Sequence, residues 1–221
     1  MSQESAASRA LMIVAVACAV TVTGLLIRKE FFAPQLVAGG PRPDRVTDDW
    51  PAIRTNGQVL SQGDTGITLV VYSDFQCPYC ERFATTTMPV LDSLFPNQVR
   101  IQFKHWPLPN HEHAEMAAEA AECGGAQGHF VGVHDALFAN TDSIGRAPWE
   151  WFATEARVPD LPAFTMCMTD GVVHESIRES AEEASRFGFT GTPTVIVNGT
   201  VIGLVDPYRL RSLIETHLTT R

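Results

Sequence analysis

The chain carries little charge for its length and has few cysteines. Charged residues make up 19% of its 221 positions, with 16 Lys and Arg against 25 Asp and Glu, and no run of basic residues occurs. The net charge of −9 argues against a nucleic acid or another polyanion as partner. Five cysteines are too few for a small domain held together by disulfides, so any cysteine pair here needs a chemical reason.

Internal repeats and low-complexity tracts are absent as well. Hydrophobic residues make up 45% of the chain, and Gly and Pro number 16 and 14. These proportions exclude a disordered chain, a collagen-like fibre and a membrane protein with many spans. The length fits one globular domain with accessory segments.

One long uncharged run does occur, at residues 10–27 (ALMIVAVACAVTVTGLLI). Its length lies at the short end of the roughly 17 to 25 residues that cross a bilayer. A secretory signal peptide is the alternative, but its apolar core is usually shorter and ends in a small-residue cleavage site, which is not clear here. We expect an uncleaved transmembrane anchor over residues 10–28 after a short tail, 1–9. Basic residues flank the run on both sides and therefore do not set its orientation.

The following segment combines turn-forming residues with no apolar periodicity. Residues 33–50 contain a Gly-Gly pair and several prolines. We expect a semi-extended linker over residues 29–56, and a globular domain over 57–221.

Within the globular part, apolar patterns predict a mixture of strands and helices. Residues 67–73 form a β-rich apolar run, and residues 99–104 alternate between apolar and polar types. Helical spacing of apolar residues lies between them and predicts a helix with a kink at Pro89. Strand, helix and strand in this order indicate the start of a parallel unit and an α/β fold.

The remainder is mainly helical until a final hairpin. Residues 108–188 favour a series of helices, punctuated by glycines and prolines. Residues 194–203 read as two short strands joined by Asn198-Gly199, a pair typical of tight hairpin turns. Asp206 and Pro207 then predict the start of a last helix that runs to about residue 217.

The strongest chemical signal is Cys77-Pro78-Tyr79-Cys80, directly after the first apolar strand and at the start of the kinked helix. Cys77 would lie where unpaired backbone N–H groups and the positive end of the helix dipole favour a thiolate, the attacking species in thiol–disulfide exchange. Cys80, one turn further on, would resolve the mixed disulfide. The alternative is half of a zinc site, but a tetrahedral site needs a second ligand pair, and no other CxxC or CxxH occurs.

A second signal is the proline of Gly191-Thr192-Pro193-Thr194, which comes just before an apolar strand. A proline cannot donate to a sheet ladder, so it is expected at a strand start or in a special peptide geometry.

Asp74, three residues before Cys77, is either a buried carboxylate that exchanges protons with Cys80 or an ordinary strand-end residue. Pro78 and Tyr79 should help to set the stability of the thiolate.

Taken together, these motifs resemble the DsbA family of the thioredoxin superfamily. Glutaredoxins share the Cys-Pro-Tyr-Cys motif but lack a long helical insertion between the cysteines and the proline loop. The resemblance covers roughly residues 57–219 and rests on the segments 72–80 (YSDFQCPYC), 106–108 (WPL), 121–124 (AECG), 189–194 (FTGTPT) and 197–199 (VNG), together with His113 and Phe130.

This resemblance implies a thioredoxin fold, with a central mixed sheet flanked by helices and an inserted helical subdomain at about 108–188. It also implies a cis Thr192–Pro193 bond that faces Cys77, with the backbone of Thr192 holding the substrate chain. The implied activity is extracytoplasmic thiol–disulfide exchange on exported proteins, with the Cys77–Cys80 disulfide as the redox group and no other cofactor or metal. A quinone-linked membrane thiol oxidase would reoxidise the pair, and the absence of a dimerisation module favours a monomer.

Two other functions remain open. The same fold can serve as a thiol reductant, for example in cytochrome maturation. A non-enzymatic module in which Cys77 and Cys80 bind copper or zinc with a histidine is the second. Five histidines are candidates for that ligand, at positions 105, 111, 113, 129 and 134. Because they are spread over a loop and two helices, we expect them to be solvent-facing or capping residues instead.

The remaining pair, Cys123 and Cys167, allows two interpretations. Both cysteines are either small buried hydrophobes or a structural disulfide between two helices of the insertion. Some relatives carry an equivalent second pair. By the loop-entropy estimate, such a bridge would stabilise the fold by roughly 3 to 4 kcal/mol. The expected anchor, the linker and this pair together place the domain outside the cytoplasm.

Overall fold

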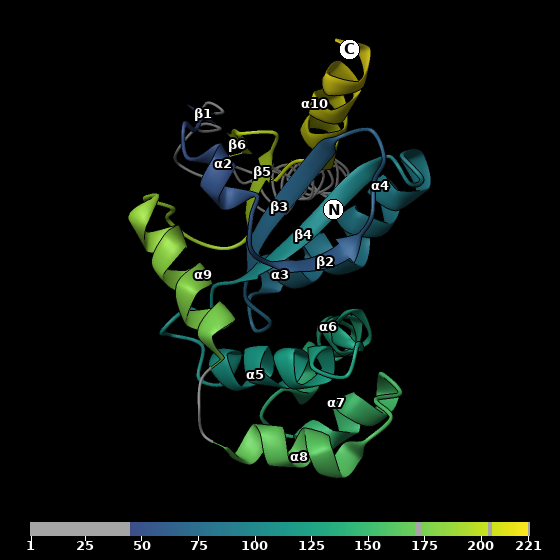
Figure 1. Cartoon of the computed structure of the whole chain (residues 1–221), viewed down its shortest axis with the longest axis vertical. Helices are drawn as coiled ribbons and strands as arrows, with labels where there is room; N and C mark the ends of the chain where they lie inside the picture. The colour runs from purple at the N-terminus through teal and green to yellow at the C-terminus, as the bar shows by residue number, and fades with distance from the viewer. Residues whose placement is uncertain (1–44, 171–173, 203–204, 221) are drawn as a thin grey trace, which may run out of the picture. The chain divides into compact units, whose positions relative to one another are not determined.

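A six-stranded mixed sheet lies at the centre of the part of the chain that the structure, a computed structural model, describes: residues 45–170, 174–202 and 205–220 (Figure 1). The strands follow the order β1, β6, β5, β3, β4, β2. β3 and β4 run parallel, and the other described neighbours are antiparallel. The bounds are β1 Arg45–Val46, β2 Gln58–Ser61, β3 Ile67–Ser73, β4 Val99–His105, β5 Thr194–Val197 and β6 Thr200–Ile202.

The central strand β3 is buried on both faces, and its alternate side chains point into two different hydrophobic clusters. Leu69 and Val71 face the larger hydrophobic cluster, which includes the helices α3, α4 and α10. Val70 and Tyr72 face a smaller cluster with α2 and α9. Helices therefore cover both faces, which confirms the predicted α/β class. The helices named here are α2 Trp50–Ile53, α3 Pro78–Arg82, α4 Met88–Leu94, α9 Glu175–Arg186 and α10 Pro207–Thr219.

The connection from β3 to β4 is helical, as predicted, but one turn is widened. A π-helical turn, Phe83–Thr87, lies between α3 and α4. α4 follows it directly, and Pro89 is the second residue of that helix. Because proline has no N–H to donate to the preceding turn and its ring crowds that turn, the helix does not keep a regular α-helical pattern through this point.

The C-terminal hairpin and helix form where the sequence predicts them. Asn198 and Gly199 join β5 to β6, and both have positive φ angles, 45° and 91°. Such angles are what a two-residue type I′ turn requires. The side chain of Asp206 accepts a hydrogen bond from the backbone N–H of Tyr208 and so caps the start of α10.

Four helices between β4 and α9 pack on one another beyond the end of the sheet (Figure 1). They are α5 Ala114–Gly125, α6 Phe130–Ala139, α7 Trp149–Glu155 and α8 Leu161–Thr169, with a short 3-10 turn at Thr141–Ser143. α9, although it follows them directly, also packs on β4. Tyr72 of β3 donates a hydrogen bond to Glu183 of α9, with an oxygen–oxygen distance of 3.0 Å.

The expected anchor at 10–28 and most of the expected linker lie outside the described residues. The described end of that linker is not semi-extended: β1 pairs with β6, and Ile53 of α2 is buried in the smaller cluster. Among the residues that the structure describes, none belongs to a helix that is both long and apolar enough to cross a membrane.

Candidate functional site

Cys77 is the residue from which the first helix after β3 begins. It occupies the N-cap position of α3, with an extended backbone (φ −81°, ψ 119°), and Pro78 is the first helical residue. Proline is well suited to this position because its fixed φ matches the helix and its missing N–H would have no partner there. The carbonyl oxygen of Cys77 accepts a hydrogen bond from the N–H of Glu81. The sulfur atom of Cys77 therefore lies at the N-terminus of a helix.

The proline loop lies against this sulfur atom. β3 and β5 are antiparallel neighbours with Tyr72 opposite Thr194, so the end of β3 meets the start of β5. The Thr192–Pro193 peptide bond just before β5 is cis. The Cys77 thiol donates to the carbonyl oxygen of Thr192 across 3.4 Å. Sheet pairing thus brings together two segments that are far apart in the sequence.

The surroundings of Cys77 favour its thiolate. A hydrogen bond from the Cys80 thiol is the largest cause, and it lowers the pKa of Cys77 to about 5 even though burial acts in the opposite direction. The side-chain hydroxyl of Thr192 and the backbone N–H groups of Tyr79 and Cys80 lower this pKa further. Donors of this kind at a helix N-terminus are the usual way in which a fold stabilises a thiolate.

Cys80 has the opposite character. Its burial raises its pKa, and its hydrogen bond to the neighbouring Cys77 and the charge of that sulfur raise it further. Only 1% of Cys80 is exposed, and the structure holds both cysteines as free thiols. The pair therefore combines one sulfur that ionises easily with one that keeps its proton.

Asp74 is buried and its carboxylate accepts three hydrogen bonds. The backbone N–H groups of Gln76 and Leu108 each donate across 2.7 Å, and the Nδ1 atom of His111 lies 2.8 Å away. These contacts join the loop before Cys77 to the loop after β4. Of the two residues between the cysteines, Tyr79 is 69% exposed and lies on the surface beside the site.

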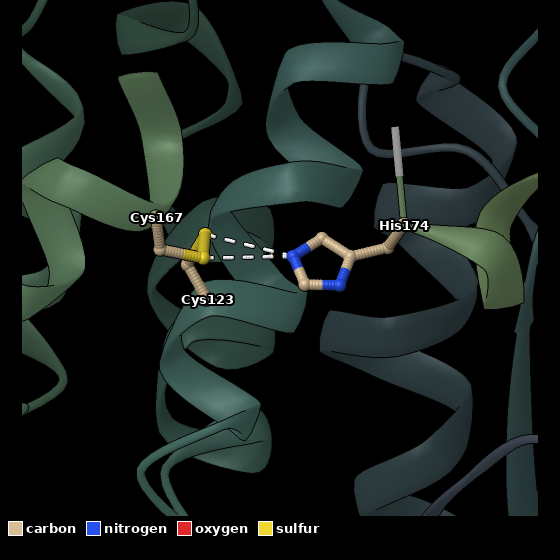
Figure 2. A group of neighbouring side chains, drawn as sticks. All are labelled: Cys123, Cys167 and His174. Atoms are coloured by element: carbon tan, nitrogen blue, oxygen red, sulfur yellow. Dashed lines mark hydrogen bonds between the residues drawn. A yellow bond between two sulfur atoms is a disulfide. The ribbon is translucent and has the colours of Figure 1, made fainter. Parts of the chain in front are cut away.

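Cys123 of α5 and Cys167 of α8 form a disulfide, with their Cα atoms 5.8 Å apart (Figure 2). The bridge ties two helices of the helical subdomain together. The ring of His174 points at its two sulfur atoms (Figure 2). Among the described residues, Cys123, Cys167 and His174 form the group whose ligand atoms lie close enough together for a metal ion, and Cys77 and Cys80 belong to no such group.

The expectation that the five histidines are solvent-facing or capping is wrong for two of them. His105 and His134 are buried among phenylalanine rings, 1% and 2% exposed. The alternation of β4 turns His105 inward, where its Nε2 atom contacts Glu122 at 2.9 Å. His113 and His129 do occupy the N-cap positions of α5 and α6, but neither side chain makes a capping hydrogen bond.

Two contacts were not foreseen from the sequence. His111 is a partner of Asp74, and His174 is a neighbour of the second cysteine pair. No motif links either histidine to its partner, because each contact joins residues of different elements. For the second cysteine pair, the sequence offered one signal: some relatives of the DsbA family carry an equivalent pair.

Comparison with known proteins gives the family. The family model described as thioredoxin matches residues 56–216. The chain therefore belongs to the thioredoxin family, and its fold is that of the DsbA-like thiol–disulfide oxidoreductases within that superfamily.

Individual relatives are similar over the same region. A thioredoxin-like oxidoreductase from Silicibacter pomeroyi is 29% identical, with a TM-score of 0.61, and the match covers 77% of this chain and 96% of that one. The thiol–disulfide exchange protein alpha-DsbA2 from Wolbachia pipientis is 16% identical, with a TM-score of 0.61 and coverage of 76% and 90%, a likeness of fold.

A curated relative of a different kind is also similar in sequence. The Na(+)/H(+) antiporter NhaA 3 of Salinispora tropica is 35% identical over 134 residues, which are 60% of this chain and 20% of that protein. The chain thus spans about a fifth of that antiporter's length.

Proposed function

We propose that the chain is an extracytoplasmic thiol–disulfide oxidoreductase that introduces or exchanges disulfides in exported proteins through Cys77 and Cys80. One observation carries the proposal: the Cys77 sulfur lies at a helix N-terminus, with a pKa lowered to about 5, and 3.4 Å from the carbonyl oxygen of Thr192. A reactive thiolate beside an available backbone segment suits a protein substrate, because an extended chain pairs with backbone groups.

The reaction follows from the unequal acidities of the two thiols. A thiolate of a reduced substrate attacks Cys77 in the oxidised pair, the Cys77–Cys80 bond breaks, and its electron pair passes to Cys80, which takes up a proton. The substrate's second thiolate then attacks the substrate sulfur of the mixed disulfide, and Cys77 leaves as a thiolate. The substrate is oxidised by two electrons and the pair is reduced. A leaving thiol of low pKa speeds the second step.

The backbone of Thr192, next to Pro193, would hold the substrate chain during these steps. Asp74 would act as a positioning residue, because its hydrogen bonds fix the loop that carries Cys77. Pro78 and Tyr79 would modulate the thiolate, Pro78 by starting the helix and Tyr79 through its backbone N–H.

The low pKa of Cys77 favours a role as oxidant over a role as reductant. A stabilised thiolate stabilises the reduced form of the pair and so makes its disulfide a stronger oxidant. Reoxidation would then require a redox partner, which we propose to be a quinone-linked thiol oxidase in the membrane. We further propose that the chain is a monomer, anchored in the membrane by residues 10–28, with its globular domain outside the cytoplasm. The Cys123–Cys167 disulfide supports this location, because disulfides persist in oxidising compartments.

The reduction potential of the Cys77–Cys80 pair, measured against a series of glutathione mixtures, tests this proposal. We expect a value more oxidising than about −200 mV. A value near that of thioredoxin, about −270 mV, would instead assign the protein to the reductants.

A further inference from the structure

We propose that Cys123, Cys167, His174 and Glu119 form a second site, which binds a thiophilic divalent cation such as Zn²⁺ once the Cys123–Cys167 disulfide is reduced. The site is separate from Cys77 and Cys80, so the proposal goes beyond the oxidoreductase function. In the oxidised protein the two sulfur atoms are bonded to each other and do not serve as thiolate ligands (Figure 2). The disulfide is thereby a switch that closes the site to metal.

The position of His174 already fits a metal-bound state. Its Nε2 atom lies 3.5 Å from the sulfur of Cys167 and 3.8 Å from that of Cys123. In a tetrahedral zinc site with Zn–S bonds of about 2.3 Å and Zn–N bonds of about 2.0 Å, the nitrogen–sulfur separation is about 3.5 Å. The imidazole therefore keeps its place when the metal enters, and the sulfur atoms separate by rotation of their side chains.

Glu119 would supply the fourth ligand by turning its carboxylate toward the released sulfur atoms, because in the oxidised protein the group of close ligand atoms holds only Cys123, Cys167 and His174. Glu119 precedes Cys123 by four residues on α5, so the two side chains share one face of that helix. Its Oε1 atom accepts a hydrogen bond from the N–H of His174 across 3.0 Å, and its Oε2 atom lies 3.7 Å from the Nε2 atom of His174. The second distance is too long for a hydrogen bond. One carboxylate oxygen thus anchors the histidine backbone while the other lies beside the imidazole ring.

The ligand set selects the class of metal. Two thiolates, an imidazole and a carboxylate suit zinc and other borderline or soft cations, whereas magnesium and calcium prefer oxygen ligands alone. The ligands come from α5, from α8 and from the residue before α9, so a bound ion would replace the covalent link between these helices. The helical subdomain would stay joined in both redox states.

Access decides where the reduction begins. Cys123 is 1% exposed, whereas Cys167 is only partly buried and 34% of the His174 side chain is exposed. A thiolate of an external dithiol attacks the Cys167 sulfur, and the electron pair of the broken bond passes to Cys123. The second thiol of the dithiol then releases Cys167 and closes a cyclic disulfide. Binding of Zn²⁺ displaces one proton from each cysteine thiol.

Cobalt is the probe for this site, because tetrahedral cobalt with thiolate ligands has intense visible bands and a sulfur-to-cobalt charge-transfer band. The full chain is prepared in detergent with Cys77→Ser and Cys80→Ser, reduced with dithiothreitol and desalted without oxygen. We expect one equivalent of Co²⁺ with charge-transfer absorption in the reduced protein and none in the oxidised protein. Zn²⁺ should displace the cobalt and remove both signals.

Single substitutions test the ligands. His174→Ala and Glu119→Gln should each weaken binding by at least about tenfold. Glu115→Gln is the matched control, an exposed carboxylate one turn earlier on α5, and should leave binding unchanged. Equal binding by the oxidised and reduced forms, or an affinity that His174→Ala does not alter, would overturn the proposal.

A loss of the helical circular dichroism signal in the reduced, metal-free protein would also test the proposed site. Since metal binding is coupled to folding, one equivalent of Zn²⁺ should then restore the helical signal. A reduced protein that stays unfolded with Zn²⁺ would contradict the proposed site. Because the catalytic cysteines are absent from the tested protein, none of these results depends on the proposed oxidoreductase activity.

Discussion

The sulfur atom of Cys77 lies 3.4 Å from the carbonyl oxygen of Thr192, although the two residues are 115 positions apart in the chain. The contact joins the start of α3 to the loop before β5, and the pairing of β3 with β5 creates it.

The two cysteines should have different roles in exchange. Cys77→Ser should abolish peptide oxidation, because it removes the sulfur that the substrate attacks. Cys80→Ser cannot form the Cys77–Cys80 disulfide and should also lose peptide oxidation. Its Cys77 thiolate can still attack a substrate disulfide, and because no Cys80 thiol is present to resolve the product, mixed disulfides should accumulate on non-reducing gels. Trapping by the Cys77→Ser variant instead would reverse the assigned order of the two thiols.

The thiolate of Cys77 should depend on a donor at position 80. The Cys80 thiol is the largest cause of the lowered pKa, so Cys80→Ala should raise the pKa of Cys77 more than Cys80→Ser, whose hydroxyl still donates. The ultraviolet absorbance of the thiolate, followed through a pH titration, measures both values. Identical pKa values in the two variants would show that the helix N-terminus alone stabilises the thiolate.

The stability of the reduced protein should change with pH in a defined direction. The folded state lowers the pKa of Cys77 to about 5, below its unfolded value of about 8.5. The stabilisation from this group is therefore fully present above about pH 8.5 and is lost as the pH falls through 5. Urea unfolding of reduced wild-type protein and of Cys77→Ser at several pH values isolates this contribution, and parallel pH profiles would contradict it.

Asp74 should be required for the geometry of the site. Asp74→Asn places an amide among three donors, two of them backbone N–H groups, and leaves one of these without an acceptor. We expect a loss of about 1 to 3 kcal/mol in the free energy of unfolding and slower peptide oxidation. The exposed Asp170→Asn is the control and should change neither quantity. Equal stability of the two variants would show that the loop does not need this carboxylate.

The buried ion pair between Lys104 and Glu183 should show an asymmetry in its substitutions. Lys104 is fully buried and contacts Glu183 of α9. Glu183→Gln leaves an unpaired buried charge and should cost about 3 to 5 kcal/mol. The double variant Lys104→Met with Glu183→Leu should be more stable than Glu183→Gln, and the exposed Glu182→Gln should have little effect. Chemical denaturation of the four proteins tests this order, and a double variant no more stable than Glu183→Gln would refute it.

Local patterns were sufficient for several elements. The apolar run at 67–73 and the Asn198-Gly199 turn lie where they were expected, because strand burial and the left-handed turn depend on residues close in sequence. The Cys77–Cys80 motif was visible for the same reason. Partners across elements were not visible: His105 and His134 are buried, and His111 contacts Asp74. A single histidine carries no signal for the element that will pack over it.

By itself, the sequence determined the order of strands and helices from residue 67 onward, the position of the CxxC pair at a helix start and the presence of a proline before a strand. Each follows from propensities and capping within a few residues. Only the tertiary structure decided which sulfur atoms meet which partners: Cys77 meets Thr192, and Cys123 meets Cys167 with His174 beside it. These contacts depend on strand register and helix packing, which arise from the burial of many side chains together.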